Sequence, residues 1–188
     1  MLPQTGVFAV EFGMALVLFL AIALGVIELA RAMYMFNTLE EVTLRAASLA
    51  AYTDFQDASA MSGVRRQAIL RNAAGTLTLG APVTDAYVRI DYLSLSDAGG
   101  VAMTAIPTAA LPSCPANNRI TCMKNPYDAS CIRLVRARIC DPAVTDSCSR
   151  VQYQTLFSLV HLPLNLPMAS AIVPAETLGA PAGAAPCP

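Results

Sequence analysis

Residues 7–27 read VFAVEFGMALVLFLAIALGVI, and Glu11 is the single charged side chain in this stretch. A helix that crosses a bilayer needs about 20 mainly apolar residues. The stretch therefore predicts a transmembrane helix near the N-terminus. The alternative is a cleaved signal peptide, whose apolar region is usually about 7–15 residues long and follows a basic region. The apolar run here is longer, and residues 1–6 contain no Lys or Arg.

The helix is expected to continue beyond the membrane as an amphipathic segment over residues 28–53. Residues 28–51 contain no Gly or Pro, so we predict one rod over residues 7–52, roughly 70 Å long at 1.5 Å per residue. Its polar face is predicted to contain Glu28, Arg31, Thr38, Glu41, Arg45 and Ser48. Its apolar face, which we expect to pack on a folded domain, contains Leu29, Met33, Phe36, Val42, Ala46 and Leu49.

The chain from residue 54 to residue 173 predicts a small domain that contains both helix and sheet. We expect a short helix over residues 54–75, capped by Asp57 or Ser62 and ended at Gly75. Strands are predicted at residues 87–93, 132–139 and 151–159 from their β-branched and aromatic content or their alternation. These strands would form a small antiparallel sheet packed on the long helix, which makes the fold class α+β.

Two segments lack a periodic pattern. Residues 96–130 contain Gly99-Gly100 and several prolines, and we expect them to form a long irregular loop held by a cross-link. Residues 174–188 are rich in Pro, Ala and Gly, which predicts a disordered tail.

The six cysteines are disulfide candidates, because an even number in an exported chain is typical of disulfides. They are Cys114, Cys122, Cys131, Cys140, Cys148 and Cys187. Six cysteines allow 15 pairings, and the sequence does not choose among them. Cys187, in the tail, either tethers the tail to its own domain, which we favour, or bonds another chain. No Cys-x-x-Cys pair occurs and His161 is the single histidine, so we expect no metal site.

The composition argues against other functional classes. The net charge is −1 and the charged fraction is 13 %, so we expect no nucleic acid partner. The sequence contains no phosphate-binding glycine loop and no nucleophile elbow, and His161 lies in an apolar run. We therefore expect neither a cofactor nor an enzymatic activity.

Glu11 requires a partner. A carboxylate inside a bilayer costs about 2.5 kcal/mol or more, so such residues are normally paired. The nearest basic residue along the helix is Arg31, about 30 Å away at helical rise. The partner must therefore be another group, unless Glu11 reaches the membrane surface near the start of the chain.

The N-terminal residues resemble a known family. Gly6-Val7-Phe8-Ala9-Val10-Glu11-Phe12 resembles the cleavage motif of type IV pilin-like proteins. Together with the apolar run and Gly25-Val26-Ile27-Glu28-Leu29-Ala30-Arg31, it is similar to the TadE-like pseudopilins of tight-adherence (Flp-type) pili. The resemblance covers residues 6–50, with a weaker likeness from Tyr153 to Leu166.

This resemblance implies a function and a pilin-like fold. Residues 1–6 would be a short leader, which a prepilin peptidase would cut between Gly6 and Val7. Glu11, followed by Phe12, would then set the register of assembly by pairing with the new ammonium group on the Val7 of a neighbour. The absence of a basic residue from the leader and of a proline from the apolar run departs from the family pattern.

The resemblance also implies partners and a location. The partners would be a major pilin, other minor pilins, the prepilin peptidase, the inner-membrane assembly platform and membrane lipid. The protein would cross the inner membrane once, with its C-terminal domain in the periplasm or outside the cell, and incorporation into a pilus is a further implication. The alternative is an unprocessed, single-span binding module anchored in the membrane.

Overall fold

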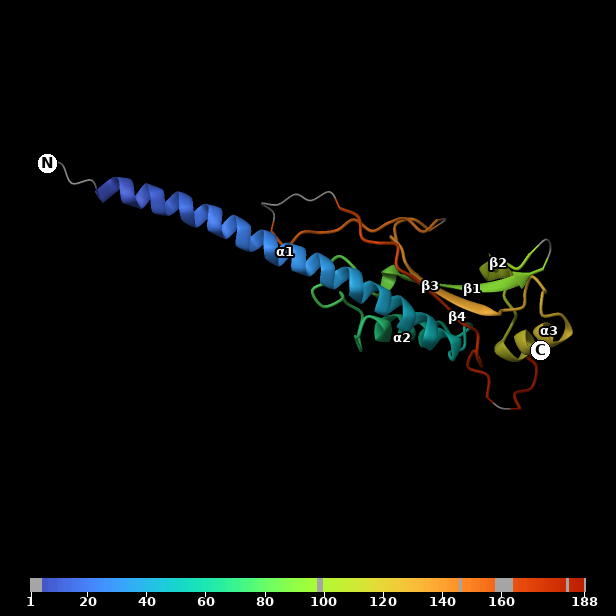
Figure 1. Cartoon of the computed structure of the whole chain (residues 1–188). Coiled ribbons are helices and arrows are strands. Elements are labelled where there is room, and N and C mark those ends of the chain that lie inside the picture. Colours follow the sequence, from blue (N-terminus) through green and yellow to red (C-terminus); the bar gives the residue numbers. More distant parts are fainter. Residues whose placement is uncertain (1–4, 98–99, 146, 158–163, 182, 188) are drawn as a thin grey trace.

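The computed structural model describes residues 5–97, 100–145, 147–157, 164–181 and 183–187. Its main feature is α1 (Thr5–Ala51), a helix of 47 residues. The N-terminal part of α1 projects as a free rod, and its C-terminal part lies along the folded domain (Figure 1). The predicted rod over residues 7–52 is therefore confirmed within two residues at each end. Proline is absent from α1, so every residue within the helix keeps the backbone N–H that the helical hydrogen bonds require.

A four-stranded antiparallel sheet covers one side of the C-terminal part of α1. It consists of β1 (Val88–Ser96), β2 (Ala102–Ala105), β3 (Leu134–Ile139) and β4 (Ser170–Pro174), in the order β2-β1-β3-β4. The shorter helical elements of the described residues are α2 (Ala58–Ala68), η1 (Asp85–Tyr87), η2 (Thr108–Ala110) and α3 (Pro115–Lys124). The α+β class is confirmed, with a long helix packed on a small antiparallel sheet.

Small residues let α1 approach the sheet closely. Ala46 and Ala47 of α1 are fully buried beside Met35 and Leu39, and they share one core with Ala137 of β3. A second core forms at the end of α1, where Ala50 and Ala51 contact residues of α2, β1 and the C-terminal segment. The helix therefore forms the central support of the domain, as its amphipathic pattern predicts.

The buried face of α1 is rotated from the predicted one. Val42 and Ala46 are buried as expected, but Leu29, Met33 and Phe36 are exposed by 63 %, 59 % and 40 %. The residues that replace them in the interface begin with two charged side chains, described below. The prediction for the first half of the amphipathic segment was wrong, because it placed every charged residue on the solvent face.

The second helix is shorter than predicted. α2 (Ala58–Ala68) begins at Asp57, whose carboxylate accepts hydrogen bonds from the backbone N–H groups of Ser59 and Ala60. It ends because Leu70 adopts a left-handed conformation with φ of 60°. The N–H of Arg71 then bonds to the carbonyl of Arg66 at 2.9 Å, which is the Schellman ending usually built on glycine.

Two further predictions for the domain were wrong. Residues 96–130 are not a long irregular loop, because they contain β2, η2 and α3. The described residues of the predicted strand at 151–159 form only one isolated bridge, between Gln152 and Asn165. The strand that completes the sheet is β4, which pairs with β3 from Leu134↔Pro174 to Arg138↔Ser170. Residues 158 and 159 lie outside the described residues.

The described part of the C-terminal segment is packed, whereas we expected a disordered tail. Leu178 is 2 % exposed and its N–H donates to the carbonyl of Ala51 at 3.0 Å, at the end of α1. Gly179 follows with φ of +80°, and a Cβ atom there would lie 2.5 Å from the backbone nitrogen of Asp54. The close approach of two backbones therefore requires glycine at this position.

Candidate functional site

The N-terminal half of α1 is long and apolar enough to cross a membrane. Its most apolar 18-residue window has a mean hydropathy of 2.5, and none of that window is buried inside the domain. A free helix with this surface would expose many apolar side chains to water, and a bilayer removes that cost. The helix fits a single-pass membrane anchor, as the sequence predicted.

The predicted cleavage and assembly residues lie together on the first turns of α1. The helix begins at Thr5, so Gly6 and Val7 lie in its first turn. Glu11 and Phe12 follow, and both are exposed, Phe12 by 61 %. Within the described part of the chain, Glu11 has no hydrogen bond or ion pair. A carboxylate in this position, surrounded by apolar side chains, would face hydrocarbon in a membrane.

The basic residue that follows Glu11 along the helix is not available to neutralise it. Arg31 is 6 % exposed, and all three of its guanidinium nitrogens donate hydrogen bonds inside the domain. Nε donates to the carbonyl of Leu79 at 2.9 Å and Nη2 to that of Ala81 at 3.0 Å. Nη1 donates to the carbonyl of Gln154 at 2.6 Å. Arg31 therefore does not supply a counter-charge for Glu11.

Arg31 belongs to a buried polar cluster, made of Glu28, Arg31 and Tyr153, at the point where α1 meets the domain. Nη1 of Arg31 lies 3.3 Å from Oε1 of Glu28 and 3.2 Å from the hydroxyl of Tyr153. The same hydroxyl donates to Oε1 of Glu28 at 2.5 Å. The N–H of Leu156 lies 3.2 Å from Oε2 of Glu28. Each charge is paired and hydrogen-bonded, which is the condition for burying it.

The charged and polar groups of this cluster are all paired with one another or with the backbone. The guanidinium of Arg31 lies over the ring of Tyr153, 5.1 Å from its centroid, which adds a cation–π contact. Burial raises the pKa of the Tyr153 hydroxyl above its ordinary value, and the hydrogen bond to Glu28 raises it further, while the charge of Arg31 opposes the rise. Among the described residues, no buried side-chain nitrogen or oxygen lacks a hydrogen-bond partner. The cluster therefore joins the membrane helix to the segments around residues 79–81 and 153–156.

Sequence reasoning missed this cluster because Glu28 and Arg31 were placed on the solvent face of the helix. The signal that could have found it is the Glu-x-x-Arg spacing directly after the apolar run. Residues three and four apart lie on one face of a helix, and the face of Glu28 and Arg31 continues with the apolar residues Ala32, Met35 and Leu39. Glu41 and Arg45, which lie four residues apart on the predicted polar face, form an ion pair on the exposed surface.

The six cysteines lie in the domain, far along the chain from the N-terminal residues, and all form disulfides. The pairs are Cys114–Cys187, Cys122–Cys131 and Cys140–Cys148. Two of them close short loops of neighbouring cysteines, whereas Cys187 returns across 73 residues to the start of α3. The tail is thus tethered to its own domain in this structure. His161, the other residue considered for chemistry, lies outside the described residues.

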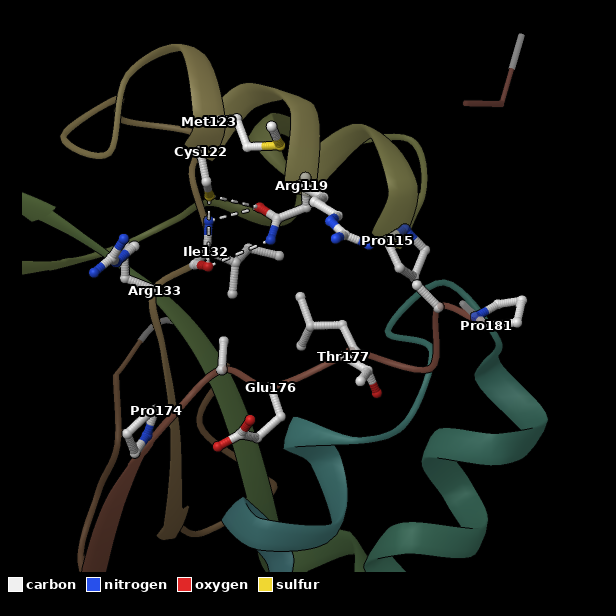
Figure 2. Close-up of a pocket in the computed structure, with 14 residues that line it drawn as sticks. Pro115, Arg119, Cys122, Met123, Ile132, Arg133, Pro174, Glu176, Thr177 and Pro181 are labelled. Atoms are coloured by element: carbon white, nitrogen blue, oxygen red, sulfur yellow. Dashed lines mark hydrogen bonds between the residues drawn. The ribbon is translucent and has the colours of Figure 1, made fainter. Parts of the chain in front are cut away.

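A groove lies between α3 and the C-terminal segment, with a volume of about 730 Å³. Figure 2 shows Met123 and Cys122 on one wall and Glu176 and Thr177 on the other. Arg119 and Arg133 also line it. Sequence reasoning did not find this groove, because its walls come from α3 and from residues 174–181, which are distant in the chain.

The comparisons with known proteins bear on the membrane helix alone. The model of a family described as TadE-like protein matches residues 6–48. The curated proteins and the solved structures contain no match to this chain. The matched residues include the predicted cleavage residues, Glu11 and the charged pair of the polar cluster, and they end before the sheet begins.

Proposed function

We propose that this protein is a processed, membrane-anchored pseudopilin that takes part in pilus assembly or its initiation. The proposal rests on the match of residues 6–48 to the TadE-like family, which is associated with the Tad pilus. A prepilin peptidase cuts between Gly6 and Val7. The mature helix then holds the protein in the inner membrane, with its disulfide-bonded domain on the periplasmic side or outside the cell.

The observation that carries the proposal is the isolated carboxylate of Glu11. It is exposed on an apolar helix, and Arg31 is fully engaged in the polar cluster. Cleavage after Gly6 would create an ammonium group on Val7, close to the depth of Glu11. The ammonium group of a neighbouring subunit can supply the missing charge, and a buried pair of this kind selects register more than it adds stability.

The exposed face of α1 supports packing against other helices. Ile22, Val26, Leu29, Met33 and Phe36 are all exposed by 40 % or more, and they follow one another at alternating intervals of four and three residues. This spacing is that of a coiled-coil seam. From Phe8 to Phe36 the apolar surface runs about 42 Å at helical rise, which exceeds the roughly 30 Å of a hydrocarbon core. The turns of α1 that carry Met33 and Phe36 therefore present apolar side chains beyond the membrane, where neighbouring helices would cover them.

The partners that follow from this proposal are a major pilin, other minor pilins, the prepilin peptidase and the assembly platform. The disulfides are compatible with an oxidising compartment, which is the reason for placing the domain on the periplasmic side. The competing proposal, an unprocessed single-span binding module, predicts that Glu11 has no role in assembly.

Processing is tested by N-terminal sequencing of the protein extracted from membranes of peptidase-competent cells. We expect the sequence Val-Phe-Ala-Val-Glu, and we expect Gly6→Val to leave the full-length chain. Gly13→Val is the matched control, because a Cβ atom at Gly13 meets nothing within 4 Å and that position lies outside the cleavage motif. An intact Met1 in the wild-type protein would contradict processing and favour the unprocessed module.

Assembly is tested by counting pili on cells that carry Glu11→Ala. We expect normal membrane insertion and strongly reduced piliation. Glu41→Ala is the control, since Glu41 is also an acidic residue of α1 but pairs with Arg45 on the exposed surface. Unchanged piliation in the Glu11 variant would remove the role of this carboxylate.

A further inference from the structure

The face of the sheet turned away from α1 carries a group of charged side chains on two neighbouring strands. Successive side chains of a strand point to opposite faces, and Val88, Ala137 and Ile139 point into the core with α1. Arg89 and Asp91 of β1, and Arg136 and Arg138 of β3, therefore share the outer face. The register places Arg89 opposite Arg138 and Asp91 opposite Arg136. We call these four residues the arginine face.

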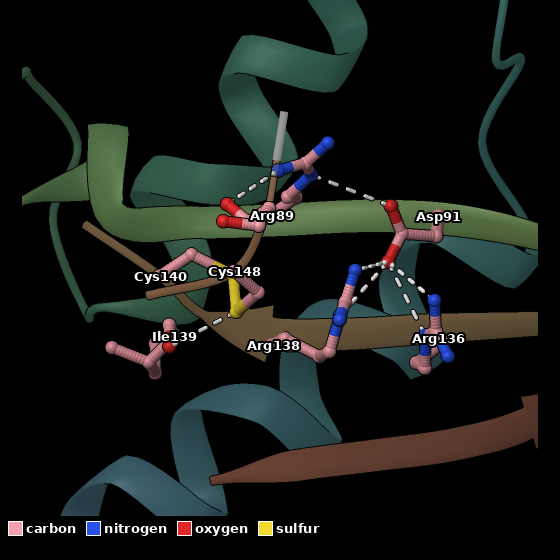
Figure 3. Close-up of a disulfide and its surroundings, with 8 residues drawn as sticks. Arg89, Asp91, Arg136, Arg138, Ile139, Cys140 and Cys148 are labelled. Atoms are coloured by element: carbon pink, nitrogen blue, oxygen red, sulfur yellow. Dashed lines mark hydrogen bonds and ion pairs between the residues drawn. A yellow bond between two sulfur atoms is a disulfide. The ribbon is translucent and has the colours of Figure 1, made fainter. Parts of the chain in front are cut away.

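One carboxylate serves three guanidinium groups on this face. Figure 3 shows Arg136 and Arg138 pointing toward Asp91. Oδ2 of Asp91 accepts from Nε and Nη2 of Arg136 at 3.2 and 3.1 Å, and from Nε and Nη2 of Arg138 at 3.0 and 2.7 Å. Nε of Arg89 lies 3.5 Å from Oδ1. The four side chains together keep two positive charges that no carboxylate among them neutralises.

The guanidinium groups also keep unused donors. A guanidinium carries five N–H bonds, and Arg136 and Arg138 each direct only Nε and Nη2 to Asp91. Within the described part of the chain they bond to no other acceptor. Their side chains are 25 % and 22 % exposed, so the remaining N–H groups are available at the surface. Asp91 holds both groups in place, which reduces the entropy lost when a second acceptor binds.

The neighbouring strand adds an apolar part to the face. Arg136 lies opposite Ile172 of β4, and Arg138 lies opposite Ser170. Ile172 is 43 % exposed. Surfaces that bind proteins are enriched in arginine and depleted in lysine relative to the rest of a protein surface, and this face has three arginines and no lysine. A surface that bound a flexible polyanion through charge alone would not need fixed guanidinium groups beside an exposed isoleucine.

We propose that the arginine face binds an acidic surface of a partner protein, whose carboxylates accept hydrogen bonds from Arg136 and Arg138 while its apolar side chains cover Ile172. Charge complementarity identifies this class of partner, because the net charge of the whole chain is −1 and the surplus of positive charge is local. Planar guanidinium groups bind carboxylates in a two-bond fork, which lysine cannot reproduce.

The test measures binding of the full-length protein, in nonionic detergent, to immobilised poly-L-glutamate at low ionic strength. We expect Arg136→Gln with Arg138→Gln to weaken binding about fivefold, because two exposed ion pairs of about 0.5 kcal/mol each together supply about 1 kcal/mol. The matched control is Arg65→Gln with Arg66→Gln, which removes the same charge from α2. An equal loss in the control pair, or no loss in the first pair, would overturn the proposal.

Two further measurements separate the proposed partner from other causes. Arg136→Lys with Arg138→Lys keeps both charges, and it tests the face even where the glutamine variant fails to fold. We expect it to weaken binding at least twofold, and unchanged binding would contradict recognition through guanidinium groups. Heparin serves as a sulfated polyanion: binding tighter than that of poly-L-glutamate, with the same loss in the glutamine variant, would point to a polyanion and overturn the assignment to an acidic protein.

Discussion

Replacing Arg31 by methionine is expected to strongly destabilise the junction between α1 and the domain. Methionine keeps an unbranched apolar stem but removes the guanidinium group and all of its donors. Glu28 would keep the Tyr153 hydroxyl and the N–H of Leu156 as donors, yet its negative charge would be buried without a cation, because Glu28 is 2 % exposed. The carbonyl groups of residues 79, 81 and 154 would also lose their donor.

The expected loss is about 3–5 kcal/mol, the usual effect of removing one partner from a buried ion pair. Small domains are stable by only about 5–15 kcal/mol, so the variant should unfold at a much lower urea concentration. The control is Arg45→Met, which removes the other Glu–Arg pair of α1. That pair is on the surface, with the Glu41 side chain 66 % exposed, and its loss should cost less than about 1 kcal/mol.

The measurement is equilibrium unfolding in urea, followed by the near-ultraviolet circular dichroism of the tyrosines, with the full-length protein in nonionic detergent. A second variant, Glu28→Gln combined with Arg31→Met, removes the unpaired charge and should recover part of the lost stability. If Arg31→Met costs no more than Arg45→Met, or if the additional Glu28→Gln change recovers nothing, the polar cluster does not hold the helix and the domain together.

Three further outcomes are expected in the same unfolding assay. Burial raises the pKa of Tyr92 in the folded protein, so the stability that its protonated form supplies is present below the ordinary tyrosine pKa of about 10 and is lost as the pH rises above it; Tyr92→Phe should flatten this alkaline loss. Cys187→Ser opens a loop of 73 residues and should cost about 4 kcal/mol, and reduction of the wild-type protein, which opens all three disulfides, should cost more. Gly179→Ala should destabilise by at least about 1–2 kcal/mol because of its left-handed backbone, whereas Gly63→Ala, with nothing within 4 Å of its Cβ position, should not destabilise; equal effects of the two changes would contradict the close approach at residue 179.

The sequence predicts those elements whose pattern is local and strong. The apolar run predicts the membrane helix. The predicted strand from Tyr87 to Leu93 covers the first six residues of β1, and the one from Ile132 to Ile139 contains β3, because their β-branched side chains match half-buried strands. The Asp57 cap is also readable, since its carboxylate acts on the two residues that follow it. These features depend on neighbours in the chain, so one sequence is enough to find them.

The features that were missed depend on distant residues. The alternation at Val151 and Tyr153 is real, but it buries these two side chains against α1 and adds no strand to the sheet. β4 is only five residues long, and it forms a strand because it pairs with β3 and packs against α1. The end of α2 at Leu70 uses a left-handed residue other than glycine, which propensity argues against.

The polar cluster was missed for a related reason. Glu28 and Arg31 have the residue types of a solvent face, and they become buried only because the segments around residues 79–81 and 153–156 supply carbonyl and hydroxyl groups to them. Their burial is a property of the tertiary structure. The pairing of Cys114 with Cys187 was likewise one of 15 possibilities, and the packing of Leu178 at the end of α1 decides in its favour.

The polar cluster has a consequence for assembly. α1 is one uninterrupted helix of 47 residues, so a rotation of its membrane segment about the helix axis also rotates the turns that contact the domain by the same amount. Glu28 and Arg31 fix the side of α1 that the domain occupies, while Leu29, Met33 and Phe36 remain exposed. For a neighbour that packed along this exposed seam, the domain and its arginine face would therefore lie at one defined angle around the axis of α1. Loss of Arg31 would release that angle even where the membrane segment inserts normally, so the same variant should lower piliation without lowering the amount of protein in the membrane.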